Sequence, residues 1–365
     1  MAAVSAASMV PSTVDNTVAR NFTSVGNETR TPEETLHVDE WAPGYAGFTT
    51  VWQDAFVGSE RQSPDTNNWN IITGNLGVNN EWQTYRGGWE NLQLSGGSTL
   101  QIVPVIANGQ WTSGRVESRY TFTPQDGRVT RAEAKLRFGD APSGNKQGIW
   151  PAFWIMGDSI RQGVRWPKNG EIDVMERVNG EWAGHGTVHC DAYPGGICDE
   201  PNGKGAGVGL PDNGWHVWRV EWDRRADNWA DEVLTWYLDG NRFHSLAGWQ
   251  VGWDVWQSLA AKPLFFILNV AVGGGWPGAP NSDTWDWYGN MMEIADAFLD
   301  PDPARDDDIP NPIAVSILVE NTLRESKREG EEDGGDAETE SEDESEDEDA
   351  CKKLATGWRL KMKLP

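Results

Sequence analysis

Short runs of apolar, β-branched and aromatic residues fill most of the chain, from about residue 44 to residue 299. Glycine, proline, asparagine and aspartate separate these runs, and hardly any stretch shows the helical period of about 3.6 residues. Short apolar runs between turn residues are typical of β-strands. The pattern predicts strands in the segments NLQLSGGSTLQIVPVI, RVTRAEAKLRF, GIWPAFWIMG, GEIDVMERV, WHVWRVEWD, EVLTWYLDG, NRFHSL and PLFFILNVAV.

The number and connection of these strands predict the fold class. The residues LDGN, at positions 238–241, read as a tight hairpin turn between two of the strands. Many strands with hairpin turns and no repeat period favour an all-β, two-sheet jelly-roll sandwich over a propeller. We expect an irregular N-terminal segment over residues 1–40, one domain over residues 41–300, and an acidic, largely disordered tail over residues 301–365.

Charge is concentrated in this tail. The formal net charge is -26, and residues 331–349 hold 13 acidic residues and no basic one. Such a tract buries too little apolar surface to fold, although the segment before it has room for one short strand or helix. Because nucleic-acid binding needs a basic surface, we expect no nucleic-acid partner. No apolar run approaches the roughly 20 residues of a membrane span, and no signal peptide is visible.

The motif GEIDVME, at residues 170–176, raises a question of parity. In a regular strand successive side chains alternate between faces, so Glu171, Asp173 and Met175 share one face and Glu176 falls on the other. A β-bulge around Val174 and Met175 inserts one extra residue and returns Glu176 to the face of the other two acids. The motif therefore predicts a bulged strand with three carboxylates on one face.

Two glutamates on one face suggest acid/base chemistry. Their side chains have the reach to bring the two carboxyl groups to about 5 to 5.5 Å, the separation that retaining glycosidases use. Asp173 between them is placed to hydrogen-bond one glutamate and, through its charge, to keep the other protonated. Two alternatives remain open on the pattern alone, a solvent-facing strand with ordinary charges and an oxygen-rich cation site.

Tryptophan is unusually frequent, with 22 in 365 residues. Indole rings stack on the apolar faces of sugars, and they also fill protein cores. We expect most of these tryptophans in the core and a handful along a ligand groove.

The three cysteines permit one short loop. Cys190 and Cys198 flank a Pro-Gly-Gly turn that is able to bring them together as a disulfide, with two free thiols as the alternative. A zinc site is not expected, because His189 and Cys190 are adjacent and no second pair offers metal-ligand spacing. We therefore assign no metal ligand to these residues, and the oxygen-rich cation site at the acidic motif stays only an alternative.

The motif and its flanks resemble one known family. GEIDVME is preceded by GIWPAFWIMG and RWPKNG and followed by GHGTVH and LNVAVGGGWPG, a combination that resembles glycoside hydrolase family 16, in particular its laminarinase or endo-β-1,3(4)-glucanase branch. The resemblance extends over about residues 49–293. It implies a jelly roll of the concanavalin A-like lectin/glucanase type with a substrate cleft on its concave sheet. It also implies a retaining endo-glucanase that hydrolyses β-1,3 or mixed β-1,3(4)-glucans through a covalent glycosyl-enzyme intermediate, without a cofactor.

The resemblance also implies roles for individual residues. Glu171 corresponds to the nucleophile, Asp173 to its helper and Glu176 to the general acid/base. The family's substrate-binding positions fall here on Trp154, Trp166, His189, Trp276 and Arg115. For each of the latter a structural role, core packing for a tryptophan or a structural hydrogen bond for His189 and Arg115, is the alternative.

One departure and several rival functions follow from the same comparison. The last strand in relatives reads like M-E-V-D-Y-V-R-V-Y, whereas MMEIADAFLDPDP starts alike and then diverges, which predicts an incomplete strand. A transglycosylase or a galactanase of the same fold keeps both glutamates, and a non-catalytic β-glucan-binding lectin typically loses one. We expect a monomer that binds a β-glucan polysaccharide, and by resemblance a secreted or cell-wall-associated protein.

Overall fold

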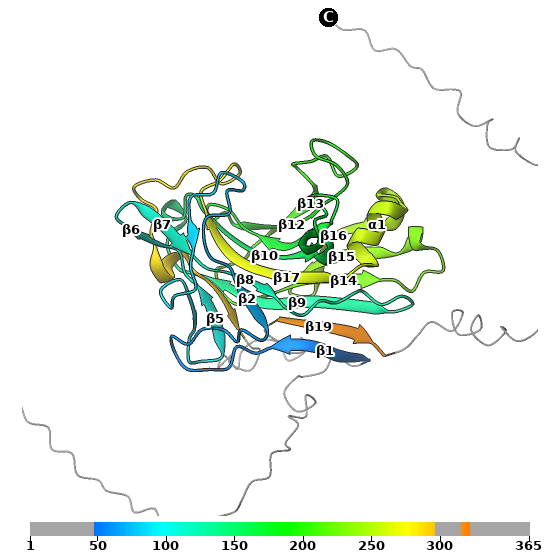
Figure 1. Ribbon diagram of the computed structural model, residues 1–365, viewed down its shortest axis with the longest axis horizontal. Coiled ribbons are helices and arrows are strands. Elements are labelled where there is room, and N and C mark those ends of the chain that lie inside the picture. The colour runs from blue at the N-terminus through cyan, green and yellow to red at the C-terminus, as the bar shows by residue number, and fades with distance from the viewer. Residues whose placement is uncertain (1–46, 296–314, 322–365) are drawn as a thin grey trace, which may run out of the picture. The chain divides into compact units, whose positions relative to one another are not determined.

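In the part of the chain that the structure describes, the strands form two large antiparallel sheets and one small sheet (Figure 1). The computed structural model describes residues 47–295 and 315–321. The predicted all-β sandwich is confirmed, because the two large sheets enclose one apolar core. The predicted N-terminal segment of residues 1–40 and most of the predicted acidic tail lie outside the described residues. None of the described helices is long and apolar enough to cross a membrane.

Among the described residues, the first large sheet has nine strands. Seven of them lie side by side in the order β16 (Asn241–Ala247), β15 (Val233–Leu238), β14 (His216–Asp223), β9 (Val129–Phe138), β18 (Met292–Ala295), β5 (Thr99–Ile102) and β4 (Leu92–Leu94). The other two are β19 (Val315–Glu320), which pairs with β9, and β1 (Phe48–Asp54), which pairs with β19.

The second large sheet has seven strands within residues 47–295 and 315–321, and it carries the acidic motif. Its order is β13 (Lys204–Gly209), β12 (Ala183–His189), β11 (Glu171–Glu176), β10 (Ile149–Gly157), β17 (Leu264–Val272), β8 (Arg115–Ser118) and β2 (Trp69–Ile71). A small third sheet contains β3 (Thr84–Tyr85), β7 (Gln110–Ser113) and β6 (Val105–Ala107). The helical elements are α1 (Trp253–Ala260) and the 3-10 turns η2 (Ser143–Asn145), η3 (Asp158–Gln162), η4 (Trp229–Asp231), η5 (Gly248–Gln250) and η6 (Trp287–Asn290).

The core between the large sheets uses alternate residues of most strands, as a two-layer sandwich requires. Six tryptophans of the described ranges are buried, namely Trp69, Trp111, Trp218, Trp222, Trp236 and Trp256. Eight are exposed, namely Trp82, Trp89, Trp182, Trp249, Trp253, Trp276, Trp285 and Trp287. The expectation that most tryptophans fill the core is therefore wrong, and much of the aromatic excess lies at the surface.

The last strand of the first sheet is complete but divided in two. Ala295 of β18 lies opposite Lys135 of β9, and Val315 of β19 lies opposite the next residue, Ala134. β18 and β19 therefore run along β9 as one strand would, with residues 296–314 inserted between them. The alternation also continues across the insertion, since Ile294 and Val315 both contribute to the core.

This pairing corrects two sequence predictions. The strand is not cut short at residue 295, and the domain does not end at residue 300, because Val315 and Ile317 are buried in the core. The residues VSILVE have a strong β pattern, but the acidic and proline-containing insertion before them separates them from the motif that marks the strand.

Removal of β19 should destabilise the whole sandwich. A chain that ends at residue 300 loses the burial of Val315 and Ile317, about 1.5–3 kcal/mol each, and leaves β1 without its partner strand. We expect insoluble protein or a melting temperature lowered by many degrees, measured by thermal unfolding. A chain that ends after Asn321 is the control and should unfold like the full-length protein. Equal melting temperatures for both truncations would show that β19 adds nothing to the fold.

Candidate active site

The predicted bulge is present in β11. Asp173 pairs with Trp154 of β10, whereas Met175 pairs with Phe153, the residue directly before Trp154, so Val174 has no partner. The register on the β12 side shifts within the same segment. Val174 and Met175 are consecutive residues, yet both side chains are buried in the core. One extra residue thus faces inward, and the residue after it returns to the outer face, the face of this sheet opposite the core.

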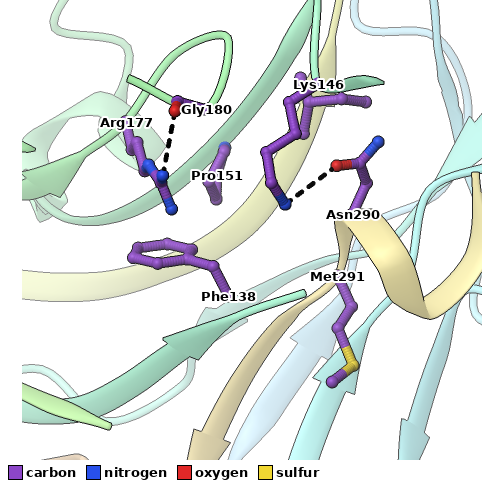
Figure 2. Close-up of a pocket in the computed structure, with 8 residues that line it drawn as sticks. Phe138, Lys146, Pro151, Arg177, Gly180, Asn290 and Met291 are labelled. Atoms are coloured by element: carbon purple, nitrogen blue, oxygen red, sulfur yellow. Dashed lines mark hydrogen bonds between the residues drawn. The ribbon is translucent and has the colours of Figure 1, made fainter. Parts of the chain in front are cut away.

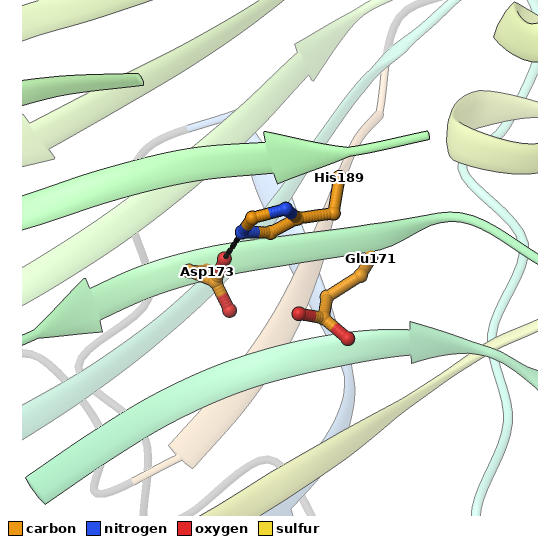
Figure 3. Close-up of side chains that lie close together, drawn as sticks. All are labelled: Glu171, Asp173 and His189. Carbon is orange, nitrogen blue, oxygen red and sulfur yellow. Dashed lines mark ion pairs between the residues drawn. The ribbon is translucent and has the colours of Figure 1, made fainter. Parts of the chain in front are cut away.

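Three acidic side chains share this outer face. Asp173 and Glu176 are buried and Glu171 is half-buried. Figure 3 shows that Glu171, Asp173 and His189 of β12 point toward one another, and ligand atoms of these three lie within 4.8 Å of one another. A group of two carboxylates and an imidazole is also compatible with a bound cation. The sequence predicts no metal site, and that expectation stays a prediction.

The surroundings of Glu176 favour its protonated form. The indole Nε1 of Trp150 donates a hydrogen bond to Glu176 Oε1 at 3.0 Å. Burial, together with the neighbouring charge of Glu171, raises the pKa of Glu176 to about 7, although His189 and the Trp150 hydrogen bond lower it. A carboxyl group with this pKa donates a proton readily near neutral pH.

Glu171 has more charge compensation around it. Trp166 Nε1 donates a hydrogen bond to Glu171 Oε2 at 3.2 Å. Burial raises the pKa of the Glu171 carboxyl, and the charge of Glu200 adds to the rise. The positive charges of His189 and Arg115 and the hydrogen bond from Trp166 act in the opposite direction. These three contacts favour the ionised carboxylate, which is the form that a nucleophile needs.

Asp173 contacts the imidazole of His189. Its Oδ2 lies 3.4 Å from His189 Nε2 but is buried without a hydrogen-bond partner, so this oxygen does not make the suggested bond to a glutamate. Burial, followed by the charges of Glu176 and Glu171, raises the pKa of Asp173 well above its usual range. The backbone carbonyl of Asp173 accepts a hydrogen bond from Trp236 Nε1 at 2.8 Å, which ties the bulge to the core. The three acids therefore carry less than three full negative charges near neutral pH.

Arg115 and Trp154 lie together beside the acids. The guanidinium carbon of Arg115 is 4.9 Å from the centroid of the Trp154 ring, and Arg115 also forms an ion pair with Glu117 at 2.8 Å. Trp154 Nε1 donates to Asn269 Oδ1 at 2.7 Å. The half-buried rings of Trp154 and Trp166 pack on the small apolar cluster Met156, Phe265 and Ile267. Both rings are thus fixed in place with part of their surface open to solvent.

Aromatic rings flank the acids on two sides. Trp276 is exposed, and its ring centroid lies 5.6 Å from that of Trp150 and 5.2 Å from that of His185. Next to Glu171, the ring of Trp166 lies 5.8 Å from Tyr193. Exposed rings at fixed positions are suited to stack against sugar rings.

A disulfide closes the loop that carries Tyr193. Cys190 and Cys198 are bonded to each other, and both are buried. Of the two alternatives that the sequence left open, the structure contains the disulfide. The loop starts directly after His189, so it connects the imidazole beside the acids to the aromatic surface.

A separate small pocket lies between β9, β10 and the turn before β18 (Figure 2). Its lining residues are Phe138, Lys146, Ile149, Pro151, Arg177, Gly180, Asn290 and Met291. Lys146 donates to the carbonyl oxygens of Gly139 at 2.6 Å and Gly289 at 3.0 Å, and Arg177 donates to the Gly180 carbonyl at 3.1 Å. Lys146 and Arg177 already donate hydrogen bonds to protein oxygens. We therefore assign this pocket a structural role and not a ligand.

The structure adds residues that the sequence analysis did not select. Trp150 lies four residues before Trp154, so strand parity places both rings on one face, and this signal was available. Asn269 is a single amide in an apolar strand, which also marks it. Glu200 and Tyr193 reach the site through the folded loop, and no local pattern identifies them.

Comparisons with known proteins identify related chains. A family model described as "XgeA-like, catalytic GH16 domain" matches residues 109–200. The chain is 28% identical to glucan endo-1,3-beta-glucosidase A1 of Niallia circulans, over 74% of this chain but only 42% of that protein. It is 31% identical to a beta-glucanase of Rhodothermus marinus, over 64% of this chain and 78% of that one.

A solved structure extends the similarity to the whole sandwich. The endo-1,3-beta-glucanase of Streptomyces sioyaensis superposes with a TM-score of 0.66 and 30% identity, over 76% of this chain and 98% of that one. Because both the fold and the sequence agree over nearly the full length of a relative, the chain belongs to glycoside hydrolase family 16, in its laminarinase (endo-1,3-β-glucanase) branch.

Proposed function

We propose that the protein is a retaining endo-glucanase that hydrolyses β-1,3 or mixed β-1,3(4)-glucans. The observation that carries the proposal is the bulge in β11, which places Glu171 and Glu176 on one face with Asp173 between them. The names of the relatives, a beta-glucanase and a glucan endo-1,3-beta-glucosidase, support a β-glucan as the substrate.

In the first step Glu171 acts as the nucleophile. Its ionised carboxylate attacks the anomeric carbon, and the bond from that carbon to the leaving sugar oxygen breaks. Glu176 donates its proton to this oxygen, which leaves as a hydroxyl. The contacts of Glu171 with Trp166 and its proximity to the charges of His189 and Arg115 support the ionised state.

In the second step Glu176 acts as the base. It takes a proton from a water molecule, whose oxygen attacks the anomeric carbon and displaces Glu171 as a carboxylate. Each step inverts the anomeric carbon, so the two steps together retain its configuration. The pKa of Glu176 suits both roles, because the group is near half ionisation at neutral pH.

Asp173 is proposed to adjust the charge of the site. It lies between the glutamates along β11, and its own charge opposes the ionisation of Glu176. The aromatic residues Trp154, Trp166 and Trp276 are proposed to stack on sugar rings, with Arg115 and His189 as polar contacts. Neither step requires a cofactor.

The rival functions differ in what they do with the same acids. A transglycosylase passes the glycosyl group to a sugar instead of water, and a galactanase accepts a different ring. A lectin without activity is less consistent with two retained glutamates in hydrogen-bonded positions. A secreted or cell-wall-associated monomer stays our expectation, and the Cys190–Cys198 disulfide supports an oxidising compartment.

Product analysis on laminarin, lichenan, cellulose and agarose tests the proposal. We expect laminarin, and to a variable degree lichenan, to be cut to a series of short oligosaccharides, since endo cleavage breaks internal bonds. Cellulose and agarose should stay intact, and EDTA should not change the rate. Degraded agarose beside intact laminarin would contradict the glucanase proposal, and products longer than the starting oligosaccharides would indicate transglycosylation. Binding of laminarin without turnover would favour a lectin.

The raised pKa of Glu176 should cost stability above neutral pH. The folded protein holds this proton up to about pH 7, whereas a glutamate in the unfolded chain releases it near its ordinary pKa of about 4.3. The folding free energy that Glu176 contributes is therefore largest below about pH 4 and is lost as the pH rises through 7.

Glu176→Gln removes this titration and keeps an oxygen for the Trp150 hydrogen bond. We expect the variant to be more stable than the parent above pH 7, by up to about 3 kcal/mol from the size of the shift. Urea unfolding at pH 5 and pH 8 measures the difference. Glu181→Gln, at a position with a half-exposed side chain, is the control. It should leave the free energy of unfolding unchanged at both pH values. A Glu176→Gln protein that gains no stability at pH 8 would show that the carboxylate is not destabilising.

A further inference from the structure

Glu200 is a buried carboxylate that the mechanism above does not use. Its side chain is 0% exposed, and each of its oxygens has one partner. Oε1 accepts the backbone N–H of Cys190 at 2.8 Å, and Oε2 lies 2.7 Å from His189 Nδ1. A buried charge with so few partners is costly unless it interacts with an opposite charge. One of its two partners is the imidazole of His189, which lies beside the three acids.

The position of Glu200 is fixed by the loop that the disulfide closes. Gly195 and Glu200 exchange two backbone hydrogen bonds, at 2.8 and 2.7 Å. The Cys190–Cys198 disulfide ties the start of the loop to a point two residues before Glu200. The backbone of Glu200 is therefore fixed by its two hydrogen bonds with Gly195 and by the nearby disulfide, which keeps its carboxylate beside His189.

Both ring nitrogens of His189 face carboxylates. Nδ1 faces Glu200 at 2.7 Å, and Nε2 faces Asp173 Oδ2 at 3.4 Å. A neutral imidazole has one N–H, so it can donate toward only one of these groups. The imidazolium has two N–H groups and can donate toward both. The 2.7 Å contact of Nδ1 with the buried Glu200 carboxylate is the one that favours the charged ring, because the raised pKa of Asp173 makes its side chain a weaker anionic partner.

The charges around His189 are mostly negative. Glu171, Asp173 and Glu176 face it from β11 and Glu200 from the loop, while Arg115 supplies positive charge near Glu171 from β8. Burial alone lowers the pKa of His189, but the hydrogen bond to Glu200 and the charges of the three glutamates raise it above its ordinary value. In return, the charged ring lowers the pKa values of Glu171 and Glu176.

We propose that Glu200 is a positioning residue that holds His189 as an imidazolium and so keeps one positive charge beside the catalytic glutamates. Without that charge, Glu171 and Glu176 both hold their protons more tightly, and the nucleophile is less often ionised. The catalytic consequence rests on the proposed function, whereas the charge state of His189 can be measured without any substrate.

The test is a titration of His189 by nitrogen-15 NMR in a Glu176→Gln background, with the signal assigned by its loss in His189→Asn. We expect both ring nitrogens to be protonated at pH 7. Glu200→Gln keeps the size and an acceptor for Cys190 N–H, but it removes the charge and directs an amide N–H toward Nδ1. We expect the proton-binding constant of His189 to fall at least tenfold, and Nδ1 to lose its proton first.

If the protein hydrolyses a glucan, the pH dependence of kcat/KM gives a second readout. With Glu176 restored, the acidic limb of the kcat/KM profile should move to higher pH in Glu200→Gln, a change that a purely structural role does not cause. Glu232→Gln is the matched control, because Glu232 is another buried carboxylate that accepts hydrogen bonds from Arg224 at 2.9 Å and Trp256 at 2.7 Å. It should lower the melting temperature and leave the His189 titration unchanged.

Two results would overturn the proposal. One is a His189 that is neutral at pH 7 in the protein with Glu200, which remains decisive even if Glu200→Gln does not fold. The other is an unchanged His189 titration in a folded Glu200→Gln protein. A protein that hydrolyses no glucan but shows the expected titration would reject the proposed function and leave the role of Glu200 intact.

Discussion

One inserted residue in β11 determines which side chains of the motif face solvent and which enter the core. In a regular strand the acidic residue at position 176 would point inward, among the apolar side chains between the two sheets. A single ionised carboxylate in such a core is costly enough to prevent folding or to force its protonation. The bulge avoids this by burying Val174 and Met175 together. The fold and the chemistry therefore depend on the same local irregularity.

The outer face then contains several carboxyl groups in a small volume. Burial and mutual repulsion favour their protonated forms, and the nearby cations and indole N–H groups favour the ionised ones. Trp150 and Trp166 each donate to a different glutamate, so the two acids lie in different surroundings. Such a difference is what allows one carboxyl to act as an acid while its neighbour acts as a nucleophile. Burial of these carboxyl groups costs folding free energy, and the burial of the large apolar core between the sheets offsets it.

The sequence predicts those features that depend on strand parity or on short loops. The bulge follows from the spacing of Asp173 and Glu176, and a Cys190–Cys198 bond is one of two outcomes allowed by the loop between them. The two-layer sandwich follows from the strand pattern and the family resemblance, whereas the order of the strands in each sheet comes from the structure. The exposed aromatic residues were underestimated, because composition alone does not tell a core indole from a surface one.

Contacts between distant segments could not be predicted in this way. The hydrogen bond of His189 with Glu200 depends on how a loop folds back, and neither residue type nor spacing specifies it. The strand β19 was hidden for a different reason. Its six residues have a clear apolar pattern, but residues 296–314 separate them from β18 in the sequence. Their pairing with β9 is a contact between distant segments, and no local pattern specifies it. Local patterns thus predict most of the strands, whereas the domain boundary depends on pairing between distant segments.

The configuration of glycosyl azides formed by two variants tests the assignment of the glutamates most directly. With an activated aryl β-glucoside, Glu176→Ala still forms the glycosyl-enzyme, because this leaving group departs without a proton donor. Azide then attacks the intermediate without a base and gives the β-azide. In Glu171→Ala no covalent intermediate forms, so azide displaces the leaving group once and gives the α-azide. Azides of opposite configuration are the predicted result, and identical configurations, or unchanged polymer hydrolysis in either variant, would contradict the account.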